Sequence, residues 1–373
     1  MTGFGEELAA LPMEELLRVA TEAAPDTVER ALAREPLDLF DFAALLSPEA
    51  GRRLEDLAQR AHALTVQRFG KTVQLYAPLY VSNECVETCT YCAFSRTNPI
   101  ARKTLTPEQA VAEARLLRAR GFRHLLIVSG EHPRHVSPEY LGTILRALAA
   151  ETPSLSVEVQ PQTEEIYREW TAAGAEGLVV YQETYDRDTY ARVHLAGKKK
   201  DFDWRLATPD RGAAGGMKRL GIGALFGLSD WRQEALRLAA HARYLVRRYW
   251  RCFVTVSFPR LRPAEYADTL ARHPLADADL ARLVCAFRLL LPDVGVVLST
   301  REPAQLRDGL VRLGVTQMSA GSRTEPGGYS APEVPTGRQF EVSDERTAGE
   351  VARTIRELGF DPVWKDWEAA LRG

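Results

Sequence analysis

Residues 74–92 read Gln-Leu-Tyr-Ala-Pro-Leu-Tyr-Val-Ser-Asn-Glu-Cys-Val-Glu-Thr-Cys-Thr-Tyr-Cys, a strand-like apolar run that leads directly into three cysteines. The run 74–81 is the first of eight short β-rich segments, and a stretch long enough for a helix follows each of them. This alternation is typical of parallel strands joined by right-handed crossovers, and the count of eight favours a closed, TIM-type (β/α)8 barrel over an open sheet. The other expected strands are 124–129, 155–159, 177–181, 221–226, 253–258, 294–299 and 315–319.

The predicted α/β barrel occupies residues 71–322 and has an extension at each end. Residues 1–70 carry helical periodicity and almost no strand signal, which predicts a helical N-terminal extension. Residues 323–373 begin with a turn-rich loop, contain one helical segment at 344–358 and are expected to close the barrel. Thr106-Pro107-Glu108-Gln109 is typical of a helix start, because it has a capping threonine and a proline at the first helical position.

The composition excludes several classes of protein. The 373 residues are 45% hydrophobic and 26% charged, and the formal net charge is −2. These values are typical of soluble globular proteins and lack the basic surplus of nucleic-acid binders, so we expect no nucleic-acid partner. The sequence has no run of 18 apolar residues and no secretion signal, which predicts no membrane association and a cytoplasmic location.

The three cysteines indicate a metal site. Cys85, Cys89 and Cys92 follow the first predicted strand directly, and five cysteines in a chain of this length exclude a disulfide scaffold. A structural zinc site needs four ligands, and no second cysteine pair is present. A [4Fe–4S] cluster held by three thiolates instead leaves one iron free to chelate another molecule. Cys252 and Cys285 lie in apolar runs and are expected in the core.

This spacing, with Tyr91 directly before the third cysteine, resembles the signature of the radical S-adenosylmethionine (SAM) enzymes. The resemblance implies a [4Fe–4S] cluster bound by Cys85, Cys89 and Cys92, with SAM on the open iron. An electron from such a cluster cleaves SAM into methionine and a 5′-deoxyadenosyl radical. Tyr91 is implied to lie against the bound cofactors.

Two glycine-bearing segments resemble SAM-binding motifs of the same superfamily. Ser129-Gly130-Glu131 resembles the Gly-Gly-Glu motif, in which Glu131 would accept a hydrogen bond from the SAM ammonium group. The segment 221–228, which includes Gly227, resembles the fifth-strand segment that lines the adenine. The resemblance also assigns three strand-end side chains to the ribose hydroxyls and methionine head of SAM: Glu158, Gln182 and Glu183.

Further segments resemble the aromatic amino acid lyases of this superfamily, and most closely the 2-iminoacetate synthase (ThiH) family of thiamine thiazole biosynthesis. In that family the radical takes a hydrogen from L-tyrosine, the Cα–Cβ bond breaks, and p-cresol and 2-iminoacetate (dehydroglycine) form. The resemblance implies that Arg301 binds the substrate carboxylate, and that Ser319 and Tyr80 contact its amino group. The resembling segments are 157–161, 180–185, 194–202, 208–211, 257–263, 298–302, 326–329 and 363–367.

The resemblance also implies partners and leaves alternatives open. A thiazole synthase (ThiG) would receive the 2-iminoacetate, and an electron donor such as flavodoxin or ferredoxin would reduce the cluster. Ala93 after the third cysteine also occurs in related enzymes that join tyrosine to a flavin precursor, and a tryptophan lyase is a further alternative. The hydrogenase-maturing sibling has extra C-terminal cysteines, and no cysteine follows Cys285 here. An alternative of another class is a non-catalytic iron–sulfur or zinc protein.

Two other groups of charged residues have plainer interpretations. His132 and His135 have no carboxylate at a recognised metal-site spacing, so we expect them to orient neighbouring loop residues. The lysine run 198–200 and the basic run 247–251 are typical of solvated faces.

Overall fold

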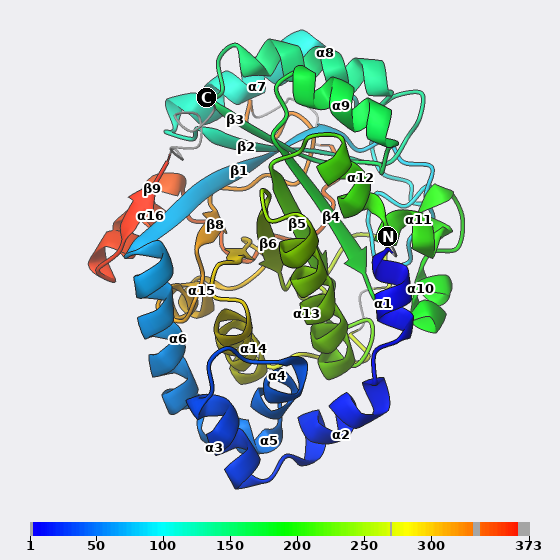
Figure 1. Cartoon of the computed structure of the whole chain (residues 1–373). Helices are drawn as coiled ribbons and strands as arrows, with labels where there is room; N and C mark the ends of the chain where they lie inside the picture. Colours follow the sequence, from blue (N-terminus) through cyan, green and yellow to red (C-terminus); the bar gives the residue numbers. More distant parts are fainter. Residues whose placement is uncertain (1–2, 269–270, 331–335, 365–373) are drawn as a thin grey trace.

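The structure is a computed structural model that describes residues 3–268, 271–330 and 336–364. Eight parallel strands form a closed barrel in chain order, in which β1 pairs with both β2 and β8 (Figure 1). The predicted (β/α)8 barrel is therefore confirmed. The strands are β1 (Thr72–Ser82), β2 (His124–Ser129), β3 (Ser154–Glu158), β4 (Gly177–Glu183), β5 (Arg219–Ala224), β6 (Phe253–Ser257), β7 (Gly295–Leu298) and β8 (Gln317–Ser319).

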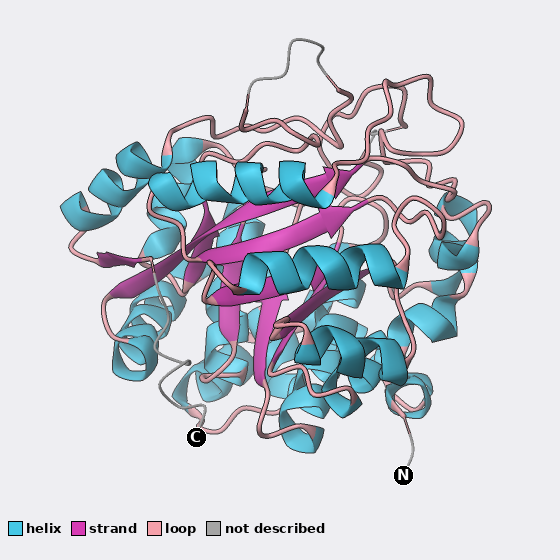
Figure 2. Ribbon diagram, turned by 90° about the horizontal axis from the view of Figure 1, so that it is seen from above, coloured by secondary structure: helices cyan, strands magenta, loops and turns pink. Residues whose placement is uncertain are grey.

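Helices enclose the strands on their outer side (Figure 2). All six residues of β2 are buried, as expected of a parallel strand covered on both faces. The side chain of Thr106 accepts from Gln109 N–H and forms the expected capping box. The helices that follow the strands are α7 (Pro107–Ala119), α8 (Pro138–Ala149), α9 (Glu164–Ala172), α10 (Arg187–Val193), α11 (Phe202–Leu206), α12 (Thr208–Ala214), α13 (Trp231–Arg248), α14 (Asp277–Leu290) and α15 (Ala304–Val311).

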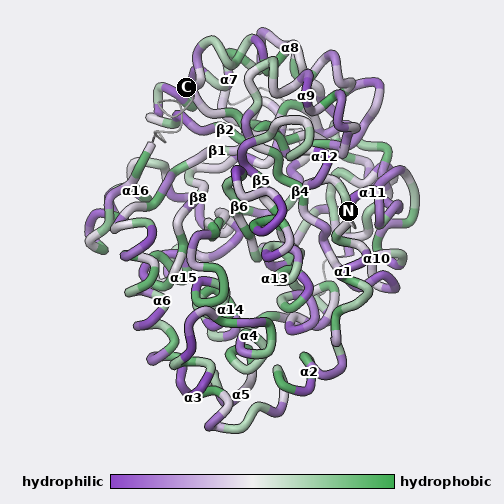
Figure 3. Tube along the Cα trace, viewed as in Figure 1, coloured by the Kyte–Doolittle hydropathy of each residue, from purple (hydrophilic) through white to green (hydrophobic). Residues whose placement is uncertain are grey.

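The N-terminal extension is helical and packs on the outside of the barrel. Helices α2 to α5 lie at the bottom of Figure 1, against α13 and α14. Arg232 on α13 donates to the carbonyls of Ala20 and Leu46, both at 3.1 Å. Apolar and polar residues alternate along these helices in Figure 3, as expected when one face is buried. The helices are α1 (Phe4–Ala9), α2 (Met13–Glu22), α3 (Pro25–Ala33), α4 (Leu39–Leu45), α5 (Pro48–Arg52) and α6 (Leu54–Phe69).

The C-terminal segment differs from the prediction in two details. Helix α16 (Ala348–Glu357) begins later than expected, because Thr347 caps it and the Asp344 carboxylate instead pairs with Arg307. A short strand, β9 (Asp361–Val363), pairs with the start of β1 and was not predicted. Three residues that include a proline carry too little alternation to indicate a strand. Of the predicted aromatic segment 363–367, residues 365–367 lie outside the described residues.

No helix within the described ranges is both long and apolar enough to cross a membrane.

Candidate active site

The three cysteines lie on the loop after β1, at the carboxyl end of the barrel strands. Backbone hydrogen bonds anchor this loop to two neighbouring segments. The N–H of Val86 donates to the carbonyl of Glu131 at 2.9 Å, and the N–H of Thr88 donates to the carbonyl of Ala196 at 3.2 Å. The loop is therefore positioned by the chain itself, on one side by the end of β2 and on the other by the segment after α10.

Gly130 is required by the close approach of this loop. A Cβ atom at Gly130 would lie 2.3 Å from the carbonyl oxygen of Glu84 and 3.2 Å from the Cβ of Cys85. Any larger residue would push the cysteine loop away from the end of β2. The small residue in the Ser129-Gly130-Glu131 motif thus has a structural reason within the chain.

The thiols of the loop are held in a low-dielectric setting. Burial raises the pKa of Cys85 to about 12, raises that of Cys89 well above its usual value and also raises that of Cys92. A metal that binds thiolates must therefore displace protons here. The other two cysteines lie elsewhere. Cys285 is buried on α14, as predicted, whereas Cys252 is only half-buried at the edge of the core and donates to the carbonyl of Met217.

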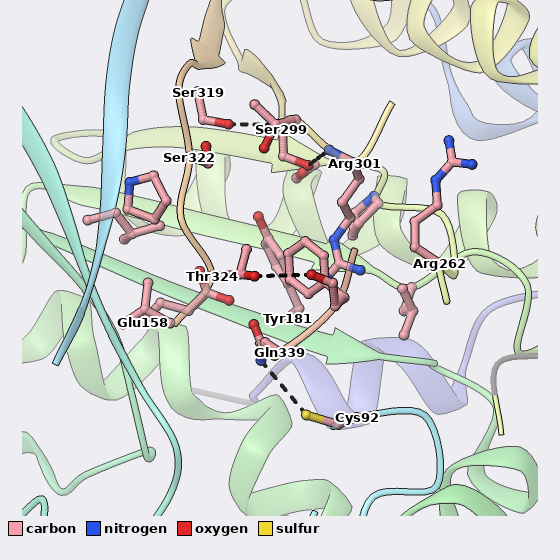
Figure 4. A pocket seen from close by; sticks show the side chains of 18 of the residues that line it. Cys92, Glu158, Tyr181, Arg262, Ser299, Arg301, Ser319, Ser322, Thr324 and Gln339 are labelled. Atoms are coloured by element: carbon pink, nitrogen blue, oxygen red, sulfur yellow. Dashed lines mark hydrogen bonds between the residues drawn. The ribbon is translucent and has the colours of Figure 1, made fainter. Parts of the chain in front are cut away.

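A central cavity opens beside the cysteine loop, between the carboxyl ends of the strands (Figure 4). It has about 930 Å³ of space, part of which is open to solvent. Its walls are mixed, since four tyrosines and several charged side chains line it. Seven of the predicted site residues line it: Tyr80, Tyr91, Cys92, Glu158, Glu183, Arg301 and Ser319.

Two hydrogen bonds link Tyr80, in the cavity wall, to Cys92 through the side chain of Gln339. The hydroxyl of Tyr80 donates to the Oε1 of Gln339 at 2.7 Å, and the Nε2 of Gln339 donates to the Sγ of Cys92 at 3.9 Å (Figure 4). Gln339 comes from the C-terminal loop and was not predicted. No pattern in the sequence singles it out, because the loop has neither helical nor strand periodicity.

Arg301 offers an uncompensated cation to the cavity. Its guanidinium stacks on the ring of Phe340, 3.3 Å from the centroid, and no carboxylate within the described ranges pairs with it. The Oγ of Ser319 accepts from the N–H of Thr300 at 3.1 Å. The Oγ of Ser322 is buried and lacks a hydrogen-bond partner in the described part of the chain. A ligand with a carboxylate and further polar groups would satisfy these side chains.

Two carboxylates of the cavity have opposite electrostatic settings. Burial and the charge of Glu183 together raise the pKa of Glu158 to about 7, against the lowering effect of Arg301. Burial would also raise the pKa of Glu183, but Lys199 and Arg205 outweigh it and lower the pKa. At neutral pH Glu183 is therefore a carboxylate, whereas Glu158 is close to its midpoint.

Lys199 corrects the prediction for residues 198–200. The run was interpreted as a solvated face, but the Lys199 side chain is only 11% exposed and its Nζ lies 2.8 Å from the Oε1 of Glu183. The same Nζ lies 5.8 Å from the centroid of the Tyr91 ring. Glu183 has a φ of 70°, a left-handed conformation that non-glycine residues rarely adopt. The pairing with β5 shifts register there, which turns Glu183 into the cavity.

Only one of the two carboxylate oxygens of Glu131 has a hydrogen-bond partner among the described residues. Its Oε1 accepts from the Nη1 of Arg205 at 3.0 Å, whereas its Oε2 is buried and has no partner among the described residues. Such an orphaned carboxylate oxygen is costly unless a bound group donates to it. The position is consistent with a donor group of a ligand beside the cysteine loop.

Five of the predicted residues do not line the cavity: Cys85, Cys89, Glu131, Gln182 and Gly227. The first three lie in or beside the cysteine loop described above. Gln182 points away from the barrel centre, and its Nε2 donates to the carbonyl of Phe202 at 3.3 Å. Gly227 has a φ of 121° and packs near Leu261 and Ala271, so its glycine identity serves the turn after β5.

The two histidines have a carboxylate neighbour that their spacing did not reveal. Ligand atoms of Glu84, His132 and His135 all lie within 4.8 Å of one another. The Nδ1 of His132 accepts from the N–H groups of Arg134 and His135, both at 3.3 Å. This ring therefore orients its own turn, in line with the prediction, and the accepting nitrogen is not free for a metal.

Comparisons with known proteins match this architecture. The Radical SAM superfamily model matches residues 79–240, and the Biotin and Thiamin Synthesis associated domain model matches residues 257–361. The chain is 46% identical over 373 residues to the 2-iminoacetate synthase of Escherichia coli (strain K12), covering 100% of this chain and 98% of the relative. It is 45% identical over 356 residues to that of Salmonella typhimurium (strain LT2), covering 95% of this chain and 94% of the relative.

The chain belongs to the 2-iminoacetate synthase family. As a radical SAM enzyme it uses a [4Fe–4S] cluster and SAM, in agreement with the expectation from the cysteine spacing. A crystal structure of HydG, a maturase of the [FeFe]-hydrogenase, is 30% identical with a TM-score of 0.84, and the match covers 96% of this chain and 78% of that one. The likeness supports the same barrel architecture in both proteins.

Several polar side chains of the site were not predicted from the sequence. Lys199 lies in a run of three lysines that was interpreted as a solvated face. Arg205 was missed because it does not follow a predicted strand, where site residues were expected. Gln339 and Ser322 come from the irregular C-terminal segment. The only available signal was the density of polar residues after the eighth strand, which indicates a loop at the catalytic face but not which side chains enter it.

Proposed function

We propose that this chain cleaves the Cα–Cβ bond of L-tyrosine to 2-iminoacetate and p-cresol, with 5′-deoxyadenosine and methionine formed from SAM, for thiamine thiazole biosynthesis. The observation that carries the proposal is a cavity that joins Cys92, a predicted cluster ligand, to Arg301, which has no carboxylate partner among the described residues. One end suits the cluster and SAM, and the other suits the carboxylate of an amino acid.

The residues present fit the cluster and SAM. Cys85, Cys89 and Cys92 supply three thiolates, which leaves one coordination position for SAM. The orphaned Oε2 of Glu131 suits the ammonium group of SAM, which carries hydrogen-bond donors. When bound, the cluster and SAM together supply the radical that removes a hydrogen from the substrate.

We assign the remaining cofactor contacts to the cavity wall beside the loop. Glu158 and Glu183 accept hydrogen bonds from the ribose hydroxyls and the methionine head, and Tyr91 packs against the bound cofactors. Lys199 keeps Glu183 ionised and turned toward them. Gln182 and Gly227 do not line the cavity, and their assignment to SAM stays a prediction.

We assign the residues that bind the substrate from their charge and their hydrogen-bonding capacity. Arg301 binds the tyrosine carboxylate through two parallel hydrogen bonds, because its guanidinium has no competing carboxylate partner within 4 Å in the described ranges. Ser319 and Tyr80 contact the amino group. Ser322, whose buried hydroxyl lacks a partner within the described residues, supplies a further polar contact.

The chemical instability of the product is the reason that we include a protein partner in the proposal. 2-Iminoacetate is an imine that water hydrolyses, so direct transfer to a thiazole synthase (ThiG) would protect it. The test is a pull-down and a coupled assay in which thiazole synthase suppresses the accumulation of the hydrolysis product. A cytoplasmic location, where thiols stay reduced, is part of the same proposal.

The function is tested by product analysis. Anaerobic, reconstituted protein with dithionite and SAM is expected to release p-cresol and 5′-deoxyadenosine from tyrosine and not from tryptophan. Cys89→Ala is expected to abolish both products and the iron–sulfur absorbance, whereas Cys285→Ala, a buried cysteine far along the chain, keeps them. Product from tryptophan alone would reassign the substrate, and binding of a cluster without SAM affinity would indicate a non-catalytic protein.

A further inference from the structure

A second hollow lies on the outer side of the cysteine loop. This outer depression has about 900 Å³ of space, part of which is open to solvent, and is lined by Glu84, Cys85, Val86, Arg96, Arg102, His132, Pro133 and Arg134. It shares no lining residue with the central cavity. Cys92 lines the central cavity and Cys85 lines the outer depression, so the cysteine loop separates the two.

This arrangement gives the cluster site two sides. Bound SAM and substrate would occupy the central cavity, on the Cys92 side. Cys85 is half-buried and faces the open depression, whereas Cys89 is buried. A redox partner outside the barrel can therefore approach the cluster ligands from the Cys85 side without displacing the reactants.

The depression is positively charged. Arg96 and Arg134 are exposed, and neither pairs with a carboxylate within the described ranges. Glu84 is the single acidic residue of the lining, and His132 and His135 lie close to it. The whole chain carries a formal charge of −2, so this patch stands out against a slightly acidic background.

Arg102 fixes the wall of the depression. Its guanidinium donates to the carbonyls of Asn83, Phe94, Ser95 and Asn98, at 2.6 to 3.2 Å. Its charge therefore cannot move away, and the surface beside Cys85 is presented in a fixed shape. Fixed positive charge around a redox site favours fast association with a negatively charged protein.

We infer that the outer depression docks a small acidic electron-transfer protein, which reduces the cluster from the Cys85 side. The inference rests on the proposed function. One electron passes from the reduced flavin or iron–sulfur centre of the carrier to the cluster; the carrier is oxidised by one electron, the cluster is reduced by one, and no covalent bond changes. Arg96 and Arg134 supply the attraction, which weakens with salt because both are solvent-exposed.

The test uses charge reversal with a matched control. The variant Arg96→Glu/Arg134→Glu changes the depression, and Arg353→Glu/Arg356→Glu makes the same charge change on exposed positions of α16. Binding of oxidised flavodoxin, an acidic flavin protein, is measured by calorimetry on the reconstituted enzyme and on the metal-free chain. Deoxyadenosine formation is measured in parallel with reduced flavodoxin and with dithionite, which needs no docking surface.

We expect the depression variant to bind flavodoxin at least tenfold more weakly, to lose the salt dependence of binding, and to lose flavodoxin-driven turnover to a similar extent. Dithionite-driven turnover stays at the wild-type level, and the α16 variant behaves like the wild type in every assay. Unchanged flavodoxin binding, an equal loss in the α16 variant, or an equal loss with dithionite would each overturn the inference. If tyrosine is not the substrate, the calorimetry still decides whether the surface binds the carrier.

Discussion

At the scale of a single residue, Arg301 is expected to determine how tightly the substrate carboxylate is bound. A lysine at this position keeps the charge but cannot form two parallel hydrogen bonds. We expect Arg301→Lys to raise the KM for tyrosine about tenfold or more, with SAM affinity unchanged. Arg262→Lys is the control, since Arg262 lines the same cavity but is already paired with Glu302 at 2.6 Å. Equal changes in both variants would contradict the assignment of Arg301.

Glu158 is expected to make SAM binding depend on pH. Its pKa is raised from 4.5 to about 7, so the side chain is neutral at lower pH and becomes a carboxylate as the pH rises through 7. The carboxylate accepts more hydrogen bonds and attracts the cationic cofactor. SAM affinity should therefore fall by up to about tenfold between pH 8 and pH 6. Burial lowers the pKa of His194, whose Nε2 lies 2.8 Å from the hydroxyl of Tyr91, to about 2, so this imidazole does not titrate in that range.

The comparison is Glu158→Gln, measured by calorimetry on reconstituted protein at both pH values. The amide cannot ionise, so the variant should show a flat profile with an affinity near that of the wild type at pH 6. A variant whose affinity still fell tenfold toward low pH would assign the titration to another group.

What the sequence could predict at this scale depends on how local the signal is. Cys85, Cys89 and Cys92 lie within one loop, and their spacing alone predicts the ligand set. Gln339 approaches Cys92 from 247 residues away, and only the folded chain brings them together. Lys199 was misjudged because a run of three lysines does not reveal which one turns inward.

At the scale of elements, Arg102 holds the cysteine loop in shape. It satisfies four backbone carbonyls that no helix or strand would otherwise pair. Hydrogen bonds from a charged donor each contribute about 1.5–3 kcal/mol, so their loss should loosen the loop. We expect Arg102→Ala to lose iron to a chelator about tenfold faster than wild type, with the melting temperature little changed.

Arg96→Ala is the matched control for this prediction, because Arg96 lies on the same loop but its side chain is exposed. It should release iron at the wild-type rate. If Arg102→Ala also kept its iron, the loop would be held by the backbone bonds at Val86 and Thr88 alone.

The elements themselves differ in how well their patterns predict them. β2 has four consecutive apolar residues and was predicted with its observed ends, His124 and Ser129. β9 was missed because it is stabilised by pairing with β1 and not by a pattern of its own. The start of α16 was placed too early because Asp344 suits a helix start in sequence but is buried in an ion pair with Arg307.

At the scale of the whole molecule, the N-terminal helices and the barrel share one packed interface. Phe4 is 2% exposed and stacks on His241 of α13, with ring centroids 4.1 Å apart and planes at 3°. The ring also meets Tyr244 at 5.5 Å. The division of the chain at residues 70 and 322 stays a prediction about folding units, and this interface makes it testable.

Phe4→Ala should lower the free energy of unfolding of the whole chain by about 3 kcal/mol or more, because it leaves a cavity against α13. Phe40→Ala, which removes the same ring from a position that is 40% exposed in the same extension, should cost less than about 1 kcal/mol. Urea unfolding is followed by far-UV circular dichroism and by iron–sulfur absorbance. If the extension and the barrel unfold together, both signals shift to lower urea in Phe4→Ala. A shift in dichroism alone would show that residues 1–70 unfold independently of the barrel that holds the cluster.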